Sequence, residues 1–166
     1  GKKADAGMYS RVYLWNKAAG AATFLVTDSY QDVREITAAG SISTLKFNFT
    51  KEQGYNYLYI DRKAFTTDGD GNFFSVLRRR FRKESKDPYS HYSMVVAKDA
   101  IETVMAGDGY GHRDGVGSDA QFMAYSTFTM QYFKGFLYIT DGVCLRTVDV
   151  AKNAVGTRSD RFVSLR

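Results

Sequence analysis

The stretch FTMQYFKGFLYITD, residues 128–141, contains two strand-like segments on either side of Lys134-Gly135. Its second half is a nearly continuous apolar run, as expected for a strand buried between two layers. Together the halves predict a β-hairpin. Residues 45–61 repeat the arrangement: LKFNFT alternates apolar and polar side chains, KEQG has the composition of a turn, and YNYLYID is apolar on both faces. We therefore expect a second β-hairpin there.

The composition agrees with a chain of strands and tight turns. The 166 residues include 15% aromatic side chains, 15 glycines and a single proline, Pro88. Aromatic and β-branched residues favour strands, and glycine favours turns. The apolar fraction of 44% allows a packed core, and no amphipathic helix of 10 or more residues is evident. We expect an all-β fold, with at most one helical turn in residues 119–124.

Two sequence echoes suggest an internal repeat. The tripeptide Leu-Tyr-Ile occurs at 58–60 and at 137–139, and residues 33–40 resemble residues 101–107, each ending in Ala-Gly. Short strands in an imperfect repeat are typical of a β-propeller, whose blades are four-stranded antiparallel sheets. We expect about three blades, at residues 8–40, 41–107 and 108–166. Further strand candidates are Ser10–Trp15, Thr23–Thr27, Phe73–Phe81, Tyr92–Ala97 and Val143–Asp149.

Residues 101–149 resemble an NHL repeat, the blade unit of NHL-type β-propellers, in four blocks that follow the family's order. IETVMAG at 101–107 is similar to the last strand, which ends Thr-Leu-Ala-Gly, and DGVGSDAQF at 114–122 is similar to Asp-Gly-x-Gly-x-x-Ala-x-Phe. GFLYITD at 135–141 resembles Gly-Asn-Leu-Tyr-Val-Ala-Asp, and LRTVD at 145–149 resembles Ile-Arg-Lys-Ile-Asp. The chain departs from the family at 123–127, where it lacks the usual Pro and Gly, and at Gly142, where the family has Asn residues.

The resemblance implies an NHL-type propeller that is a partial ring or a fragment, because about four to eight blades are needed for closure. The remaining blades of the same protein, or a homo-oligomer, would then complete the ring. Large divergent blades are also similar to those of IPT/TIG-plus-NHL proteins of gut Bacteroidetes, which implies export to the periplasm or cell surface. No apolar run approaches the ~18 residues that span a bilayer, so we expect no transmembrane segment.

The resemblance also indicates a binding face, because the loops that join successive blades gather at one end of a propeller. The glycine-rich stretch before residue 115 carries polar and aromatic groups suited to such a face. We therefore expect a non-catalytic scaffold that recognises a glycan or a protein ligand through blade-connecting loops. The predicted ligand-binding residues are Tyr110, His112, Arg113, Asp114 and Asp141.

An enzyme is the alternative: a lyase or hydrolase with a site in the central channel. The sequence contains no P-loop, no G-x-S-x-G elbow and no H-E-x-x-H motif. The segment DGDGN at 68–72 imitates the start of a calcium loop, but Phe73 and Arg79 occupy its sixth and twelfth positions. We expect a turn there, no catalytic residue, no metal and no cofactor. Cys144 is expected to be a small buried apolar residue.

A basic run is the sharpest charge feature of a chain with a formal net charge of +5. Its cations are Arg78, Arg79, Arg80, Arg82 and Lys83, with Phe81 between them. Arginines beside an aromatic ring can hold phosphates and stack a base, which makes RNA binding a second alternative. Basic runs are more often solvated surface, so a nucleic acid is not the partner that we expect.

Overall fold

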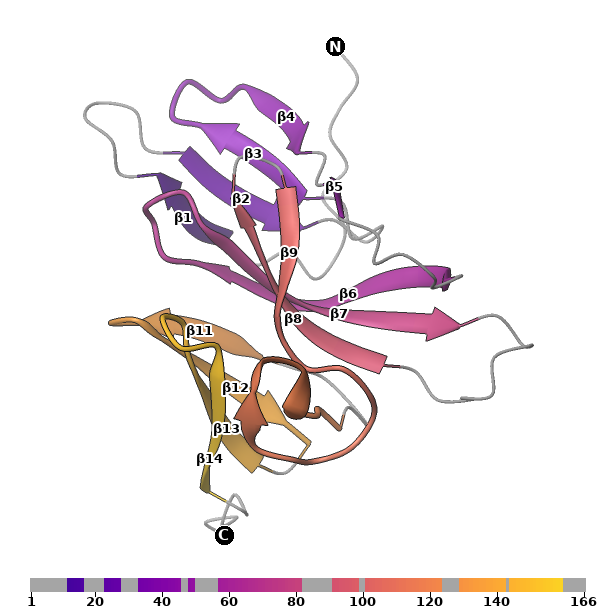
Figure 1. Ribbon diagram of the computed structural model, residues 1–166. Helices are drawn as coiled ribbons and strands as arrows, with labels where there is room; N and C mark the ends of the chain where they lie inside the picture. The colour runs from indigo at the N-terminus through magenta and orange to yellow at the C-terminus, as the bar shows by residue number, and fades with distance from the viewer. Residues whose placement is uncertain are drawn as a thin grey trace, which may run out of the picture.

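The computed structural model describes residues 12–16, 23–27, 33–45, 48–49, 57–81, 91–98, 101–123, 129–142 and 144–159. These residues form three mainly antiparallel sheets and one short 3-10 turn, η1 (Gly117–Asp119) (Figure 1). The prediction of an all-β fold is confirmed. Within the described part of the chain, no helix is long and apolar enough to cross a membrane.

Each sheet contains four strands that follow one another in sequence order. The first sheet comprises β1 (Val12–Asn16), β2 (Thr23–Thr27), β3 (Val33–Thr37) and β4 (Ile42–Leu45). The second comprises β6 (Tyr57–Thr67), β7 (Phe73–Phe81), β8 (His91–Lys98) and β9 (Ile101–Ala106), with β5 (Asn48–Phe49) parallel to β9. The third comprises β11 (Met130–Phe133), β12 (Phe136–Asp141), β13 (Cys144–Asp149) and β14 (Ala154–Ser159), with β10 (Gly115–Val116) beside β14.

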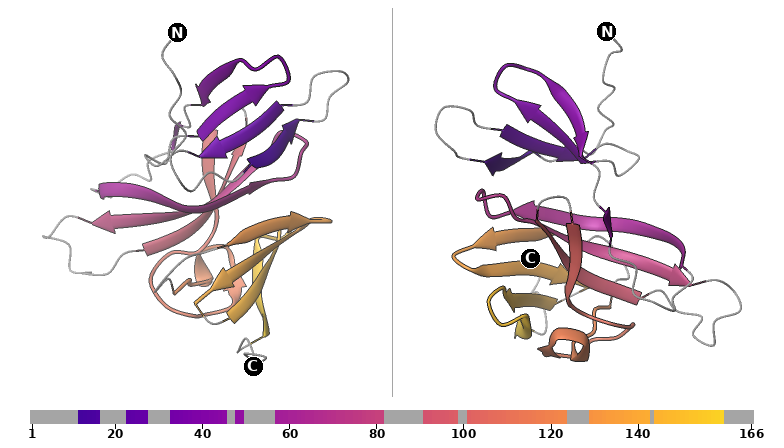
Figure 2. Two further views of the ribbon diagram at one scale, coloured as in Figure 1. Left: turned by 180° about the vertical axis from the view of Figure 1, so that it is seen from behind. Right: turned by 45° about the horizontal axis from the view of Figure 1, so that its top comes forward.

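The second sheet lies between the other two (Figure 2). Successive side chains of a strand point to opposite faces, so neighbouring residues of β7 serve two different cores. Phe73 belongs to the cluster that contains Leu25 and Val33 of the first sheet. Phe74 belongs to the larger cluster that contains Leu137 of the third sheet. The sheets therefore stack face to face in chain order.

The three sheets stack with the same polarity. The first strand of the second sheet, β6, contacts β1 on one side and β11 on the other. The first strands are thus neighbours, and the chain passes from the fourth strand of one sheet to the first strand of the next. On the face toward the first sheet, Arg62 pairs with the buried Glu102 at 2.6 Å, and its guanidinium lies over the ring of Phe73.

One predicted hairpin is confirmed and the other is wrong. Residues 130–141 form the hairpin β11–β12 across Lys134-Gly135. Residues 45–61 do not form a hairpin: β5 pairs in parallel with β9, and β6 pairs with β7 from Tyr57 to Thr67. The long β6–β7 pairing is closed by the predicted turn at 68–72, where the Asp68 carboxylate accepts hydrogen bonds from the Asp70 and Asn72 amides.

The sequence echoes do not connect equivalent strands. Residues 58–60 lie in β6, the first strand of its sheet, whereas residues 137–139 lie in β12, the second. Residues 33–37 form the third strand of the first sheet, whereas 101–106 form the fourth strand of the second. β4, which follows Gly40, belongs to the first sheet, and the predicted blade bounds stay predictions. The repeat that the structure shows is one of strand topology.

Candidate functional site

The third sheet is preceded by the segment 107–123, which we call the connecting loop. It follows β9 and contains β10 and η1 (Figure 1). Backbone hydrogen bonds tie it to itself and to the sheet: the Gly107 amide donates to Gly117 O, and the Gly117 amide donates to Asn153 O, each at 2.9 Å. β10 pairs with β14 through Gly115 and Val155. These bonds define the path of the loop over one end of the third sheet.

Arg146, on the inward face of β13, is the centre of the site. Its side chain is completely buried. Nη1 donates to Gln121 O at 2.6 Å and to Asp141 Oδ2 at 2.9 Å. Nη2 donates to Arg113 O at 2.7 Å and to Asp114 Oδ1 at 2.9 Å. One guanidinium group thus joins β12 and β13 to two separate parts of the connecting loop. We call this arrangement the Arg146 clamp.

Phe122 and Gly107 complete the packing around the clamp. Phe122 is completely buried, and the Arg146 guanidinium carbon lies 4.9 Å from its ring centre. Gly107 has a φ of 89°, and a β-carbon there would lie 2.7 Å from the Phe122 ring and 2.8 Å from Tyr92 O. Only glycine fits this position without movement of its neighbours.

The two carboxylates of the clamp lie in different electrostatic surroundings. Burial raises the pKa of Asp141 above its ordinary value and outweighs the opposing effects of Arg146 and the Met123 amide, which donates to Oδ1 at 3.0 Å. Burial also acts to raise the pKa of Asp114, but hydrogen bonds from Thr157 and Arg146 together outweigh it, so this pKa is lowered. The Thr157 amide and hydroxyl donate to Asp114 at 2.7 and 2.8 Å.

The structure brings the five predicted site residues to one end of the third sheet but divides them into two groups. His112 and Arg113 are exposed, and Arg113 Nε donates to Asp119 O at 2.6 Å. Tyr110 is half-buried and packs against the larger core cluster, which contains Phe74 and Leu137. Asp114 and Asp141 belong to the clamp. The Asp141 side chain has no exposed surface, and its contact with a ligand stays a prediction.

Sequence reasoning missed the role of Arg146. The residue lies within a block of the family resemblance, but no function was expected of it. Its neighbours offered a signal: Arg146 alternates with outward residues and shares a face with the buried Val148. A charged residue at an inward position of a strand is buried only with partners, which points to the aspartates nearby.

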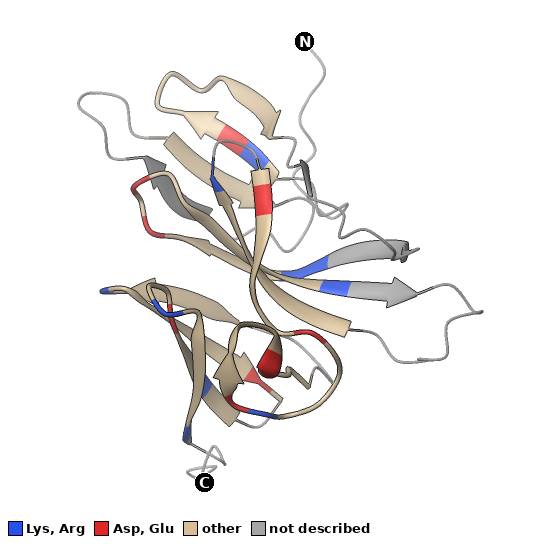
Figure 3. Ribbon diagram, viewed as in Figure 1, with Lys and Arg blue, Asp and Glu red and all other residues tan. Residues whose placement is uncertain are grey.

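The other sequence candidates have varied outcomes. Cys144 is buried, as predicted. Arg78 is half-buried in β7, whereas the side chains of residues 79–83 lie outside the described part, so the predicted basic patch stays a prediction. The connecting loop contains three aspartates, Asp108, Asp114 and Asp119, and Arg113 is its one Lys or Arg residue (Figure 3). Among the described residues, no group of three or more His, Cys, Asp or Glu side chains is placed to hold a metal ion.

Comparison of the chain with known protein families, with curated proteins and with solved structures finds no match. The resemblance to NHL repeats therefore stays a prediction that depends on the four sequence blocks.

Proposed function

We propose that the protein is a non-catalytic binding scaffold that recognises a glycan or a protein ligand through the connecting loop. The observation that carries this proposal is the Arg146 clamp beneath the exposed His112 and Arg113. A buried guanidinium fixes the Arg113 carbonyl and the Gln121 carbonyl, so the loop backbone is ordered before a ligand arrives. Preorganisation of this kind reduces the entropy lost on binding.

We further propose that the three sheets are blades of an NHL-type propeller on an exported protein. Two observations support the propeller arrangement. Each sheet has four strands in sequence order, and the first strands β1, β6 and β11 are neighbours. In a propeller the first strands line the central axis, and the loop that enters each blade reaches the same end of the ring. In the proposed arrangement the connecting loop would have that position.

The exposed side chains of the loop define the chemistry of the proposed contact. Arg113 offers a planar set of N–H donors, His112 offers a ring that donates and accepts, and the half-buried Tyr110 offers an aromatic face. Such groups suit hydroxyl and carboxylate oxygens together with the apolar face of a sugar ring or a peptide side chain.

The test is a double variant, His112→Ala with Arg113→Ala, applied to an array of neutral and acidic oligosaccharides and to a peptide display library. Both side chains are exposed, so we expect the variant to unfold at the same temperature and to lose binding. The matched control, Lys98→Ala with Lys152→Ala, removes two exposed cations elsewhere and should bind normally. Unchanged binding by the loop variant would contradict the proposed ligand site. Binding to the oligosaccharide array would indicate a glycan ligand, and binding to the peptide library would indicate a protein ligand.

A further inference from the structure

The stack of sheets ends in two outer faces, each of which carries apolar side chains. Five large hydrophobic side chains are strongly exposed among the described residues. Four of them lie on the two end faces: Ile42 on the first sheet, and Val116, Phe133 and Tyr138 on the third. Apolar side chains concentrated on one face, rather than scattered, indicate an interaction surface.

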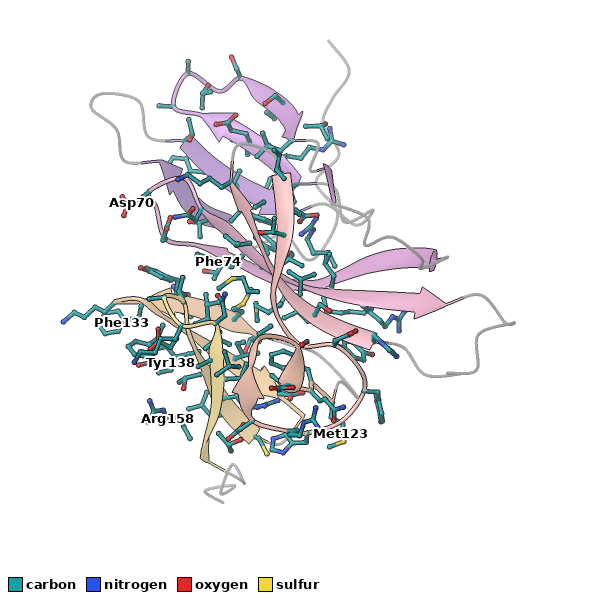
Figure 4. All side chains as sticks on the ribbon, viewed as in Figure 1. Asp70, Phe74, Met123, Phe133, Tyr138 and Arg158 are labelled. Carbon is teal, nitrogen blue, oxygen red and sulfur yellow. The ribbon has the colours of Figure 1, made fainter. Side chains whose placement is uncertain are left out.

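The strand register assigns these residues to the outer faces. Phe133 is paired with Phe136, and Tyr138 alternates with Leu137 and Ile139, which are buried toward the second sheet. Figure 4 shows Phe133 and Tyr138 on the side of the third sheet remote from Phe74. We call this surface the aromatic end face.

The outer face of the first sheet is assigned in the same way. Ile42 is paired with Ile36, which is paired with Phe24. These positions alternate with Leu25 and Val33, which pack on the second sheet. We call this surface the aliphatic end face; its apolar members are Phe24, Val26, Ile36 and Ile42.

The interface between the second and third sheets shows how such faces pack. The second sheet contributes bulky side chains, among them Phe74, Tyr92 and Met94. The third sheet meets them mainly with aliphatic side chains, among them Leu137, Ile139 and Val148. Because all the sheets stack with one polarity, the aromatic end face is the equivalent of the Phe74 face. The aliphatic end face is likewise the equivalent of the Leu137 face.

We propose that the aromatic end face binds the aliphatic end face of a second copy of this chain, so that copies associate head to tail. The contact continues the stacking that already joins the three sheets. It is heterologous, so association proceeds until a ring closes or a filament grows. The proposal rests on the propeller-type stacking of the proposed function and is independent of the connecting-loop site.

The test is the oligomeric state of the wild-type chain and of single-face variants, measured by sedimentation velocity over a range of concentrations. We expect the wild type to exceed the 18.7 kDa of one chain as concentration rises. Ile42→Lys and Tyr138→Lys should each raise the dissociation constant by about tenfold or more, because each buries an unpaired ammonium group. Ile101→Lys, at a side chain 55% exposed outside the two end faces, should associate as the wild type does.

Mixing the two variants tests the head-to-tail geometry. The chain with Ile42→Lys keeps its aromatic end face, and the chain with Tyr138→Lys keeps its aliphatic end face. Each alone should be a monomer, and their equimolar mixture should form a two-chain species and nothing larger. Phe133→Lys replaces Tyr138→Lys if circular dichroism shows that the latter fails to fold.

Three outcomes would overturn the proposal: a wild type that stays monomeric up to about 100 µM, a single variant that still dimerises alone, or end faces that bind a polysaccharide while the chain stays monomeric. The loop variant with His112→Ala and Arg113→Ala should associate normally. A failure of the ligand site is thereby distinguished from a failure of this interface.

Discussion

Arg146 Nη1 lies 2.9 Å from Asp141 Oδ2, and neither side chain has any exposed surface. Removing two charges from water is costly, so a buried pair stabilises the folded state only when further hydrogen bonds satisfy both groups. Both terminal nitrogens of Arg146 meet that condition through the carbonyls of Arg113 and Gln121 and through Asp114, whereas its Nε is buried without a hydrogen-bond partner among the described residues. The pair thus stabilises the path of the connecting loop as well as the sheet.

The first prediction concerns the loss of this clamp. Arg146→Met keeps apolar bulk but leaves Asp141 buried without its cation. It also removes one donor from Arg113 O and one from Gln121 O, which keep only their mutual backbone hydrogen bonds. We expect the free energy of unfolding to fall by about 3–5 kcal/mol. The control is Arg158→Met, because Arg158 is exposed on the outer side of the neighbouring strand and bonds only Thr147 in the described structure. Arg158→Met should change the free energy of unfolding by no more than about 1 kcal/mol. If urea unfolding shows that the two variants lose the same free energy of unfolding, the Arg146 clamp does not stabilise the fold.

The second prediction is that the two aspartates of the clamp respond to pH with opposite sign. The pKa of Asp114 is lowered from 3.8, so its contribution is present above that value and is lost as the pH falls through the folded pKa. The pKa of Asp141 is raised from 3.8, so its contribution is present below that value and is lost as the pH rises through the folded pKa.

Asparagine variants separate the two contributions. The stability difference between the wild type and Asp114→Asn should shrink as the pH falls from about 6 to about 3, in urea unfolding. The corresponding difference for Asp141→Asn should change in the opposite direction over the same range. Slopes of the same sign would show that the two carboxylates share one environment, contrary to the structure.

Structural features that depend on residues close in sequence could be predicted from the sequence more successfully than features that depend on distant residues. The hairpin at 130–141 depends on adjacent residues: Lys134 and Gly135 both adopt positive φ, as a two-residue hairpin turn requires, and the flanking strands pair in register. The false hairpin at 45–61 had equally good local signals. Its second strand, β6, pairs instead with β7 from Tyr57 to Thr67. Local composition does not indicate with which strand a segment forms the longer set of backbone pairs.

The clamp could be inferred only in part for the same reason. Asp141 and Arg146 are close in sequence, and the pairing of Asp141 with Cys144 in the β12–β13 hairpin brings them together. The contact of Arg146 with Arg113 spans 33 residues and depends on the route of the connecting loop. The residue types at 108–114 were sufficient to predict a loop. Which side chains of that loop are exposed depends on how the loop packs against β13, and the sequence does not show this.

The third prediction concerns the ion pair within the second sheet, on its face toward the first sheet. Glu102 is 2% exposed and pairs with Arg62, which also donates to the Ser75 hydroxyl. Glu102→Gln removes the charge partner and should lower the free energy of unfolding by about 3 kcal/mol. Replacing both residues, Arg62→Met with Glu102→Leu, should cost less than Arg62→Met or Glu102→Leu alone. A double variant that loses the sum of the single losses in a double-mutant cycle would show that the pair is not coupled.

The final prediction compares two glycines that share a positive φ but differ in their surroundings. Gly40 has a φ of 80° and open space within 4 Å of the position a β-carbon would take, whereas Gly107 has a φ of 89° and both Phe122 and Tyr92 O within 3 Å of that position. Gly40→Ala should cost about 1–2 kcal/mol, the strain of the left-handed backbone alone. Gly107→Ala should cost about 1–3 kcal/mol more, because the Phe122 ring must move away from the clamp. That movement disturbs the Arg146 contacts, so Gly107→Ala should also make the connecting loop more sensitive to limited proteolysis, while Gly40→Ala should not. If the two variants lose equal stability and the loop is equally resistant in both, the packing of Gly107 against Phe122 does not hold the loop in place.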